Sequence, residues 1–277
     1  MKFTKMHGIG NDYVYVNCFE EDVADPERLA IEVSDRHFGV GSDGLVLVCP
    51  SDSADCRMRM FNADGSEAEM CGNGIRCVAK FAFEHGISTS NPMRIETLAG
   101  MKELAIIEEN GIVEKVTVDM GTPVLNRSLI PMLGPDGKVI HEPLEVNGST
   151  FNITCVSVGN PHCIIFEDDV DAVRLEEIGP QIETHEVFPK RINVHFVQVM
   201  GKGEIKMRTW ERGSGITLAC GTGATATCVA CALNEKTGRE VLAHLPGGDL
   251  ELTWDDDDHV YMKGPATEVF QGEWPAG

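Results

Sequence analysis

Two cysteines in one repeated motif are the residues of this chain best placed to do chemistry together. Cys71 opens the segment Cys-Gly-Asn-Gly and Cys220 opens Cys-Gly-Thr-Gly, each ahead of an apolar, helix-like run. The offset between them is 220 − 71 = 149 residues. One thiol could remove a proton from one side of a carbon while the other returns a proton to the opposite side. The pair therefore predicts the chemistry of a cofactor-independent racemase or epimerase.

A cysteine at the start of a helix also lies where an anion can bind. The first backbone N–H groups of a helix have no partner within it, and they form the positive end of the helix dipole. This position can lower the pKa of a thiol from about 8.5, and it favours a bound carboxylate. Either motif alone could be only a strand-to-helix turn with a buried cysteine. Two matched copies favour a functional site.

Polar residues repeat at the same offset and could complete the site. Asn11 and Asn160 each follow a glycine, and Asn62 and Glu211 each lie nine residues before the cysteine of their half. A single Asn is often only a turn former, but matched positions indicate side chains that face a shared ligand. Amide and carboxylate groups suit the ammonium and carboxylate groups of an amino acid. Arg212 could clamp a carboxylate with two parallel hydrogen bonds.

One histidine adjoins this set. His162 follows Asn160-Pro161. A histidine is often simply a hydrogen-bonded polar residue, but this one could help to deprotonate a thiol.

The repeat predicts a duplicated fold that must position these groups. Residues 74–84 and 223–233 are apolar nearly all round, so we expect one buried central helix in each half, wrapped by strands. The domains are expected at residues 1–121 plus 266–277, and at 122–265. The expected strands cover 14–16, 44–49, 56–61, 94–97, 102–108, 112–119, 151–157, 162–166, 193–200 and 204–210, with a further helix over 26–35.

Composition excludes several classes of partner. The 277 residues carry a net charge of −21, which argues against nucleic acid and anionic membranes. The N-terminus does not resemble a signal peptide, and no apolar run approaches the ~20 residues that span a bilayer. We therefore expect a cytoplasmic protein whose ten cysteines are mostly free. The acidic run 255–258 is interpreted as a solvated turn.

Two other patterns are not interpreted as binding sites. Cys228 and Cys231 form a Cys-x-x-Cys pair inside the second apolar helix, where packing is the simpler explanation. Residues 39–44 spell Gly-x-Gly-x-x-Gly but open onto a strand-like run, unlike a dinucleotide fingerprint. No metal and no cofactor are expected. An alternative remains in which the chain is a non-catalytic metal-binding protein that uses these two cysteines with Cys71 and Cys77.

Taken together, the motifs resemble a known family, the diaminopimelate epimerases, over nearly the whole chain and in the same order. The matching segments are His7–Asp12, Phe61–Ser66, Cys71–Cys77, Gly159–His162, Arg191–Val194, Glu211–Gly213 and Ala219–Ala224. The resemblance implies an α/β (α+β) fold of two pseudo-symmetric domains. Each would be a barrel-like, mostly antiparallel sheet around a central helix, with the active site in the cleft between the domains.

The resemblance also implies an activity and the residues that perform it. It implies interconversion of LL- and meso-diaminopimelate, small amino-acid substrates in lysine and peptidoglycan precursor synthesis, without pyridoxal phosphate or metal. Cys71 and Cys220 would be the catalytic thiols, His162 and Glu211 would tune them, and the protein would act as a homodimer. The implied substrate contacts are Asn11, Asn62, Gly72, Asn73, Asn160, Asn193, Glu211, Arg212, Gly221 and Thr222.

A neighbouring two-thiol isomerase, such as a proline or hydroxyproline racemase, is the main alternative. Asn62, Glu211 and Arg212 argue against it, because proline has no distal amino-acid group for them to recognise. The chain departs from the family pattern at Gly44, where some members carry Gln, and at Ile216, where many carry Glu.

Overall fold

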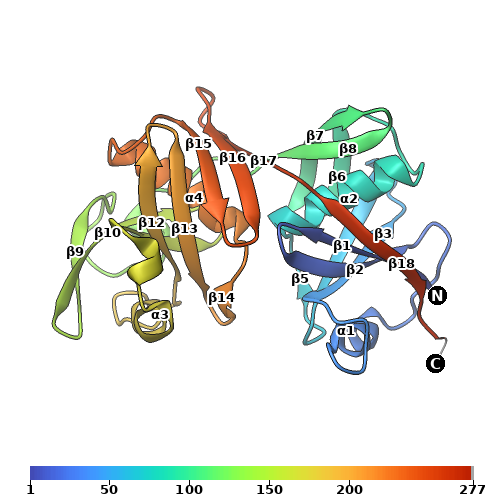
Figure 1. The fold of residues 1–277 in the computed structure, drawn as a ribbon, viewed down its shortest axis with the longest axis horizontal. Helices are drawn as coiled ribbons and strands as arrows, with labels where there is room; N and C mark the ends of the chain where they lie inside the picture. The colour runs from blue at the N-terminus through green and yellow to red at the C-terminus, as the bar shows by residue number, and fades with distance from the viewer. Residues whose placement is uncertain (276–277) are drawn as a thin grey trace. The chain divides into compact units, whose positions relative to one another are not determined.

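The computed structural model describes residues 1–275, which divide into two compact units (Figure 1). The first unit comprises Met1–Asp119 together with residues 263–275, and the second comprises Met120–Met262. Within the described residues, no helix is both long and apolar enough to cross a membrane.

The first unit is a continuous sheet with two helices. Its strands are β1 (Lys2–Gly8), β2 (Asn11–Asn17), β3 (Gly44–Cys49), β4 (Cys56–Asn62), β5 (Glu67–Ala68), β6 (Met93–Thr97), β7 (Gly100–Glu109), β8 (Ile112–Asp119) and β18 (Thr267–Glu273). Its helices are α1 (Pro26–Ser34) and α2 (Gly72–Glu84). The strand order is β18-β1-β2-β3-β4-β6-β7-β8, and only the β2–β3 and β4–β6 pairs among these are parallel. The end of the chain thus returns to pair with its first strand.

The second unit repeats this arrangement. Its strands are β9 (Glu142–Val146), β10 (Ser149–Ser157), β11 (Pro161–Phe166), β12 (Asn193–Gly201), β13 (Glu204–Glu211), β14 (Gly215–Thr217), β15 (Glu240–Leu245) and β16 (Gly248–Trp254), and β17 (Val260–Gly264) crosses the unit boundary. Its helices are α3 (Leu175–Glu183) and α4 (Gly221–Leu233), with short 3-10 turns at Arg127–Leu129 and Val170–Ala172. The order is β9-β10-β11-β12-β13-β15-β16, with β11–β12 and β13–β15 parallel.

The 149-residue offset relates the two units element by element. Adding 149 to the bounds of α2 gives 72 + 149 = 221 and 84 + 149 = 233, which are the bounds of α4. From β1 and from β10 onward, the pairings alternate antiparallel and parallel in the same order. The expected mixed fold with two repeated halves is confirmed.

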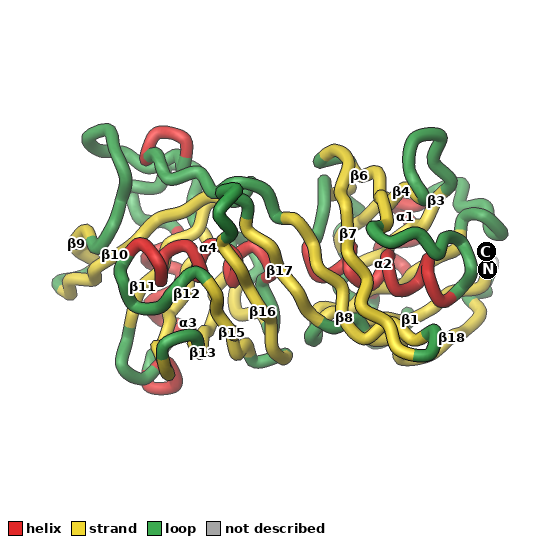
Figure 2. Tube along the Cα trace, turned by 90° about the horizontal axis from the view of Figure 1, so that it is seen from above, coloured by secondary structure: helices red, strands yellow, loops and turns green. Residues whose placement is uncertain are grey.

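Each central helix is enclosed by the strands of its own unit. All residues of α2 from Gly72 to Ala82 are buried, and the helix contacts β1, β2, β3, β4, β7 and β8 (Figure 2). Helix α4 likewise contacts β10, β11, β12, β15 and β16. Small residues let α4 approach the sheet closely, because a Cβ at Gly223 would lie 2.2 Å from Cε1 of His195 on β12. Burial on all sides explains why α4 has no polar face.

Both central helices begin two residues earlier than expected, at Gly72 and Gly221 instead of Gly74 and Gly223. The apolar pattern starts only after the glycines, whereas the helix starts directly after the cysteine. Several elements lie outside the expected ranges: α3, which contains Pro180, and the strands β1, β5, β9 and β14 to β18. The acidic residues 255–258 lie in an exposed turn between β16 and β17, as interpreted.

Gly44 illustrates how tightly the strands pack. A Cβ at this position would lie 2.1 Å from the backbone oxygen of Phe61 and 2.8 Å from Cε1 of Tyr13. Gly44→Ala should therefore reduce the free energy of unfolding by about 1–3 kcal/mol, measured by urea denaturation. Gly238→Ala is the control, because a Cβ there meets nothing within 4 Å; its effect should stay under about 0.5 kcal/mol. Equal stability of the two variants would contradict this packing.

Candidate active site

In the first unit, Cys71 caps the start of α2. Its extended backbone (φ −130°, ψ 122°) turns the chain into the helix, and Sγ accepts a hydrogen bond from the backbone N–H of Gly74 at 3.4 Å. The thiol donates to Oδ1 of Asn11 at 3.3 Å. The helix start and the N-terminal end of β2 therefore meet at this sulfur.

A hydrogen bond to Asp43 fixes the orientation of the Asn11 amide. Its Nδ2 donates to Oδ2 of Asp43 at 2.8 Å, which leaves the amide oxygen facing the sulfur of Cys71. Asp43 also accepts from the backbone N–H of Asp12 at 3.1 Å and from Arg36 Nη2 at 3.0 Å. Asp43 was not expected from the sequence, because its counterpart at the repeat offset is the apolar Ile192 (43 + 149 = 192), which gives no paired signal.

The other expected residues of this unit divide into two groups. Gly72 and Asn73 form the first turn of α2 directly after Cys71, and Asn73 is buried. Asn62 is the last residue of β4, and its Nδ2 donates to Oγ of Ser66 at 3.0 Å. Asn11, Gly72 and Asn73 are thus gathered at Cys71, whereas the hydrogen bond of Asn62 is local.

In the second unit, Cys220 caps the start of α4 and is only 4% exposed. Its Sγ lies 3.7 Å from Oγ1 of Thr222. Burial raises the pKa of this thiol well above its ordinary value, and the carboxylate of Glu211 raises it further. Hydrogen bonds from Thr222 and from the backbone N–H of Gly223 at the helix start lower this pKa, but desolvation and the nearby negative charge outweigh them. Cys220 is therefore a protonated thiol at neutral pH.

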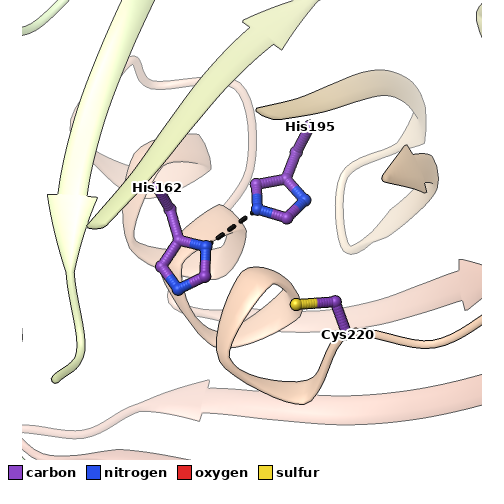
Figure 3. Close-up of side chains that lie close together, drawn as sticks. All are labelled: His162, His195 and Cys220. Atoms are coloured by element: carbon purple, nitrogen blue, oxygen red, sulfur yellow. Dashed lines mark hydrogen bonds between the residues drawn. The ribbon is translucent and has the colours of Figure 1, made fainter. Parts of the chain in front are cut away.

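Two buried histidines lie beside this thiol (Figure 3). Nδ1 of His162 and Nε2 of His195 are 2.8 Å apart. Nε2 of His162 is 2.8 Å from Oδ1 of Asn160, and Nδ1 of His195 is 2.9 Å from Oγ1 of Thr209. The four side chains form one hydrogen-bonded chain from β13 to the turn before β11.

The direction of this chain follows from its end at Asn160. An amide oxygen only accepts, so His162 carries its proton on Nε2 and its Nδ1 accepts from His195. His195 in turn accepts from the Thr209 hydroxyl. Burial holds the pKa of His162 well below its ordinary value, and the neighbouring His195 lowers it further; burial lowers the pKa of His195 to about 3. Both rings are therefore neutral at neutral pH.

The remaining expected residues surround this cluster. Oε1 of Glu211 accepts from Oγ1 of Thr217 at 2.6 Å. Asn193 accepts from the backbone N–H of Arg212 at 2.9 Å and donates to the backbone oxygen of Pro161 at 2.9 Å, which ties β11 and β12 to the turn after β13. Nη1 of Arg212 donates to the backbone oxygen of Lys190 at 3.1 Å. Gly221 and Thr222 are the first residues of α4.

His195 and Thr209 were missed because each lies inside a strand pattern, where an isolated polar residue carries no motif. The histidine pair belongs to the second unit alone: the positions 149 residues earlier are Tyr13 and Val46. Sγ of Cys220 and one nitrogen of each ring lie within 4.8 Å of one another. Among the described residues, this is the group of three that could ligate a metal ion.

Comparison with solved structures identifies the fold. A PhzF-family phenazine biosynthesis protein from Bacillus anthracis aligns with a TM-score of 0.70 and 19% identity, covering 100% of this chain and 99% of the other. A probable proline racemase from Agrobacterium radiobacter aligns with a TM-score of 0.70 and 15% identity, covering 100% and 93%. At this identity, the likeness shows the fold alone.

Sequence comparison is more specific. The family profile for diaminopimelate epimerase matches residues 3–126 and 154–269. The diaminopimelate epimerase of Pelotomaculum thermopropionicum is 58% identical over 278 residues, and that of Agathobacter rectalis is 55% identical over 281 residues; each alignment covers 99% of both chains. With a cysteine capping the same buried helix in each half, this chain belongs to the diaminopimelate epimerase family.

Proposed function

We propose that this protein is an isomerase that interconverts LL- and meso-diaminopimelate by a two-base mechanism that uses Cys71 and Cys220. The observation that carries the proposal is the matched position of the two thiols, each at the cap of a buried helix that begins with glycine. Membership of the epimerase family supports the reaction.

The mechanism moves one proton at each face of the α-carbon. One cysteine, as the thiolate, takes the α-proton, and the electron pair left on carbon delocalises toward the α-carboxylate. The other cysteine, as the thiol, donates its proton to the opposite face, and the two roles exchange in the reverse direction. In this mechanism one sulfur acts at each face of the same α-carbon.

Helix starts are the groups available to stabilise the carbanion. Backbone N–H groups at Gly72, Gly221 and Thr222 belong to the first turns of α2 and α4, where an anion is favoured. Fixed dipoles of this kind act on the charge that develops in the transition state. The α-carboxylate is proposed to bind backbone N–H groups of this kind, and Asn73, in the first turn of α2, is proposed as a further contact.

The thiols have different partners for their protons. Asn11 accepts from the thiol of Cys71, whereas Glu211 supplies a carboxylate beside Cys220. Glu211 and the neutral His162 are proposed to tune Cys220, since each can accept or hold a proton near it. The proposed distal contacts to the second amino-acid group are Asn62, Asn160, Asn193 and Arg212.

Replacing either thiol tests the mechanism. Cys71→Ser and Cys220→Ser should each lower the rate of epimerisation by about 10²- to 10⁴-fold, because an alcohol is a far poorer base than a thiolate. The assay is proton NMR of LL-diaminopimelate in deuterated buffer with a reducing agent and no added cofactor. The α-proton signal should disappear as the meso isomer forms.

Controls separate this function from its alternatives. Cys18→Ser, at a half-buried thiol outside the repeated motif, should retain activity. Wild-type exchange at free proline but not at diaminopimelate would instead favour a proline racemase-type isomerase. Epimerisation that survives loss of either Cys71 or Cys220 would overturn the two-base assignment.

Arg212 tests substrate recognition separately from proton transfer. Lysine keeps the charge but not the planar pair of donors, so Arg212→Lys should raise KM by roughly 10- to 150-fold, corresponding to the loss of about 1.5–3 kcal/mol from a charged hydrogen bond. The kcat should fall much less. Arg191→Lys, at an exposed guanidinium 3.4 Å from Glu183, is the control. A fall in kcat alone would argue against a binding role for Arg212.

We also propose a cellular location and an oligomeric state for the enzyme. All ten cysteines are free, which suits the reducing cytoplasm, where the product would serve lysine and peptidoglycan precursor synthesis. We propose a homodimer, so sedimentation equilibrium should give about twice the mass of the 30.2 kDa chain. A single-chain mass at micromolar concentration would contradict this state.

A further inference from the structure

We propose that His162, His195 and Cys220 form a binding site for a zinc-like transition-metal ion, and that occupation of this site reversibly switches off the Cys220 thiol. Metal binding is inferred from geometry alone, whereas inhibition of the thiol rests on the proposed function of Cys220 in proton transfer.

The three ligand atoms are already gathered. They lie within 4.8 Å of one another, and the two facing ring nitrogens are 2.8 Å apart. A tetrahedral zinc site, with metal–ligand bonds of about 2.0–2.3 Å, separates its ligand atoms by roughly 3.3–3.6 Å. Shifts of about 1 Å, through side-chain rotation, are enough to reach that geometry. Figure 3 shows the rings and the sulfur grouped beside the start of α4.

The far side of each ring already has the partner that a metal-bound histidine needs. A ligating imidazole almost always donates its other N–H to an oxygen, which fixes the ring and its tautomer. Nε2–H of His162 donates to Asn160, so its Nδ1 lone pair already faces the cluster. His195 needs only to move its proton from Nε2 to Nδ1, where the hydroxyl oxygen of Thr209 can accept it.

The donor set selects the kind of ion. Two imidazole nitrogens and one thiolate favour zinc, cobalt or copper, whereas magnesium and calcium prefer oxygen. Binding replaces the thiol proton: Cys220–SH and the divalent ion give the metal thiolate and one released proton. A water molecule can fill the fourth position. No oxidant or reductant is needed, so a chelator reverses the step.

The occupied site cannot do acid–base chemistry. The sulfur lone pair that would take the α-proton is bound to the metal, and the thiol proton that would be donated has left. The effect belongs to one half of the enzyme, because Tyr13 and Val46 occupy the positions in the first unit that match the two histidines. Cys71 has no comparable imidazole pair at its repeat-matched positions and serves as an internal control.

Cobalt titration of the whole protein tests the site directly. Chelator-treated protein is kept reduced with a phosphine and titrated with Co²⁺ without substrate. We expect a near-ultraviolet thiolate-to-cobalt absorption and the intense visible bands of four-coordinate cobalt, saturating at about one ion per chain. Zinc should displace the cobalt. Cys220→Ser should abolish the thiolate band, whereas Cys71→Ser should retain it.

Matched variants at Thr209 distinguish a metal site whose ligands the protein orients from adventitious metal binding. Thr209→Val keeps the shape but removes the oxygen that orients His195, and should weaken cobalt binding by about 10- to 100-fold. Thr209→Ser keeps the hydroxyl and should bind nearly as wild type does. His195→Gln removes a ligand and should weaken binding more than Thr209→Val does. If His195→Gln fails to fold, as judged by thermal melting, the wild-type cobalt spectrum and the comparison of Thr209→Val with Thr209→Ser still test whether the metal site exists.

Activity measurements then test the switch. Zinc should inhibit wild-type epimerisation in proportion to site occupancy, and a chelator should restore it. A missing thiolate band, or equal binding by Thr209→Val and Thr209→Ser, would overturn the metal site. Full epimerisation with the site occupied would overturn the switch. Because binding is measured without substrate, an error in the proposed reaction would leave the cobalt spectrum intact, and the two failures remain distinguishable.

Discussion

The organisation of each unit depends on one constraint: a helix enclosed by strands must still satisfy the backbone groups at its ends. The first N–H groups of α2 and α4 cannot be paired within the helix, and strands surround the helix body. In both units a cysteine stands at the cap, followed by glycine. The same feature that begins the buried helix therefore creates a place that favours an anion beside a thiol, and the duplicated fold supplies that place twice.

The two units match closely in their backbone, but the side chains around their sulfurs differ. The bounds of α2 and α4 match residue for residue at the repeat offset, yet the two sulfurs have different surroundings. Cys71 donates to an amide oxygen that Asp43 holds in place. Cys220 lies near two neutral imidazoles and a carboxylate. A reaction that takes a proton at one face and returns it at the other needs two bases, but it does not need identical ones.

Burial explains why the second site carries a chain of hydrogen bonds. An imidazole without a partner in a buried position would lose its hydrogen bonds to water, at a cost of about 1–3 kcal/mol for each unsatisfied group. His162 and His195 are fully buried, and each ring nitrogen has a neighbour within 2.9 Å. The chain fixes both tautomers in the absence of a ligand. A group that displaces one proton, such as a metal ion, would change the hydrogen bonds along this whole series of side chains.

The sequence by itself determined the repeat, the two cysteines, the central helices and the family, because these depend on residue identity at a fixed offset and on apolar patterning. It also indicated Asn11, Asn160, His162 and Glu211 through their matched or adjacent positions. Tertiary structure decided what those residues touch. Strand pairing brings His195 and Thr209 to His162 from separate strands, and desolvation, which depends on everything packed around the thiol, reverses the effect that a helix start alone would have on Cys220. Such contacts join residues far apart in the chain, and no local pattern encodes them.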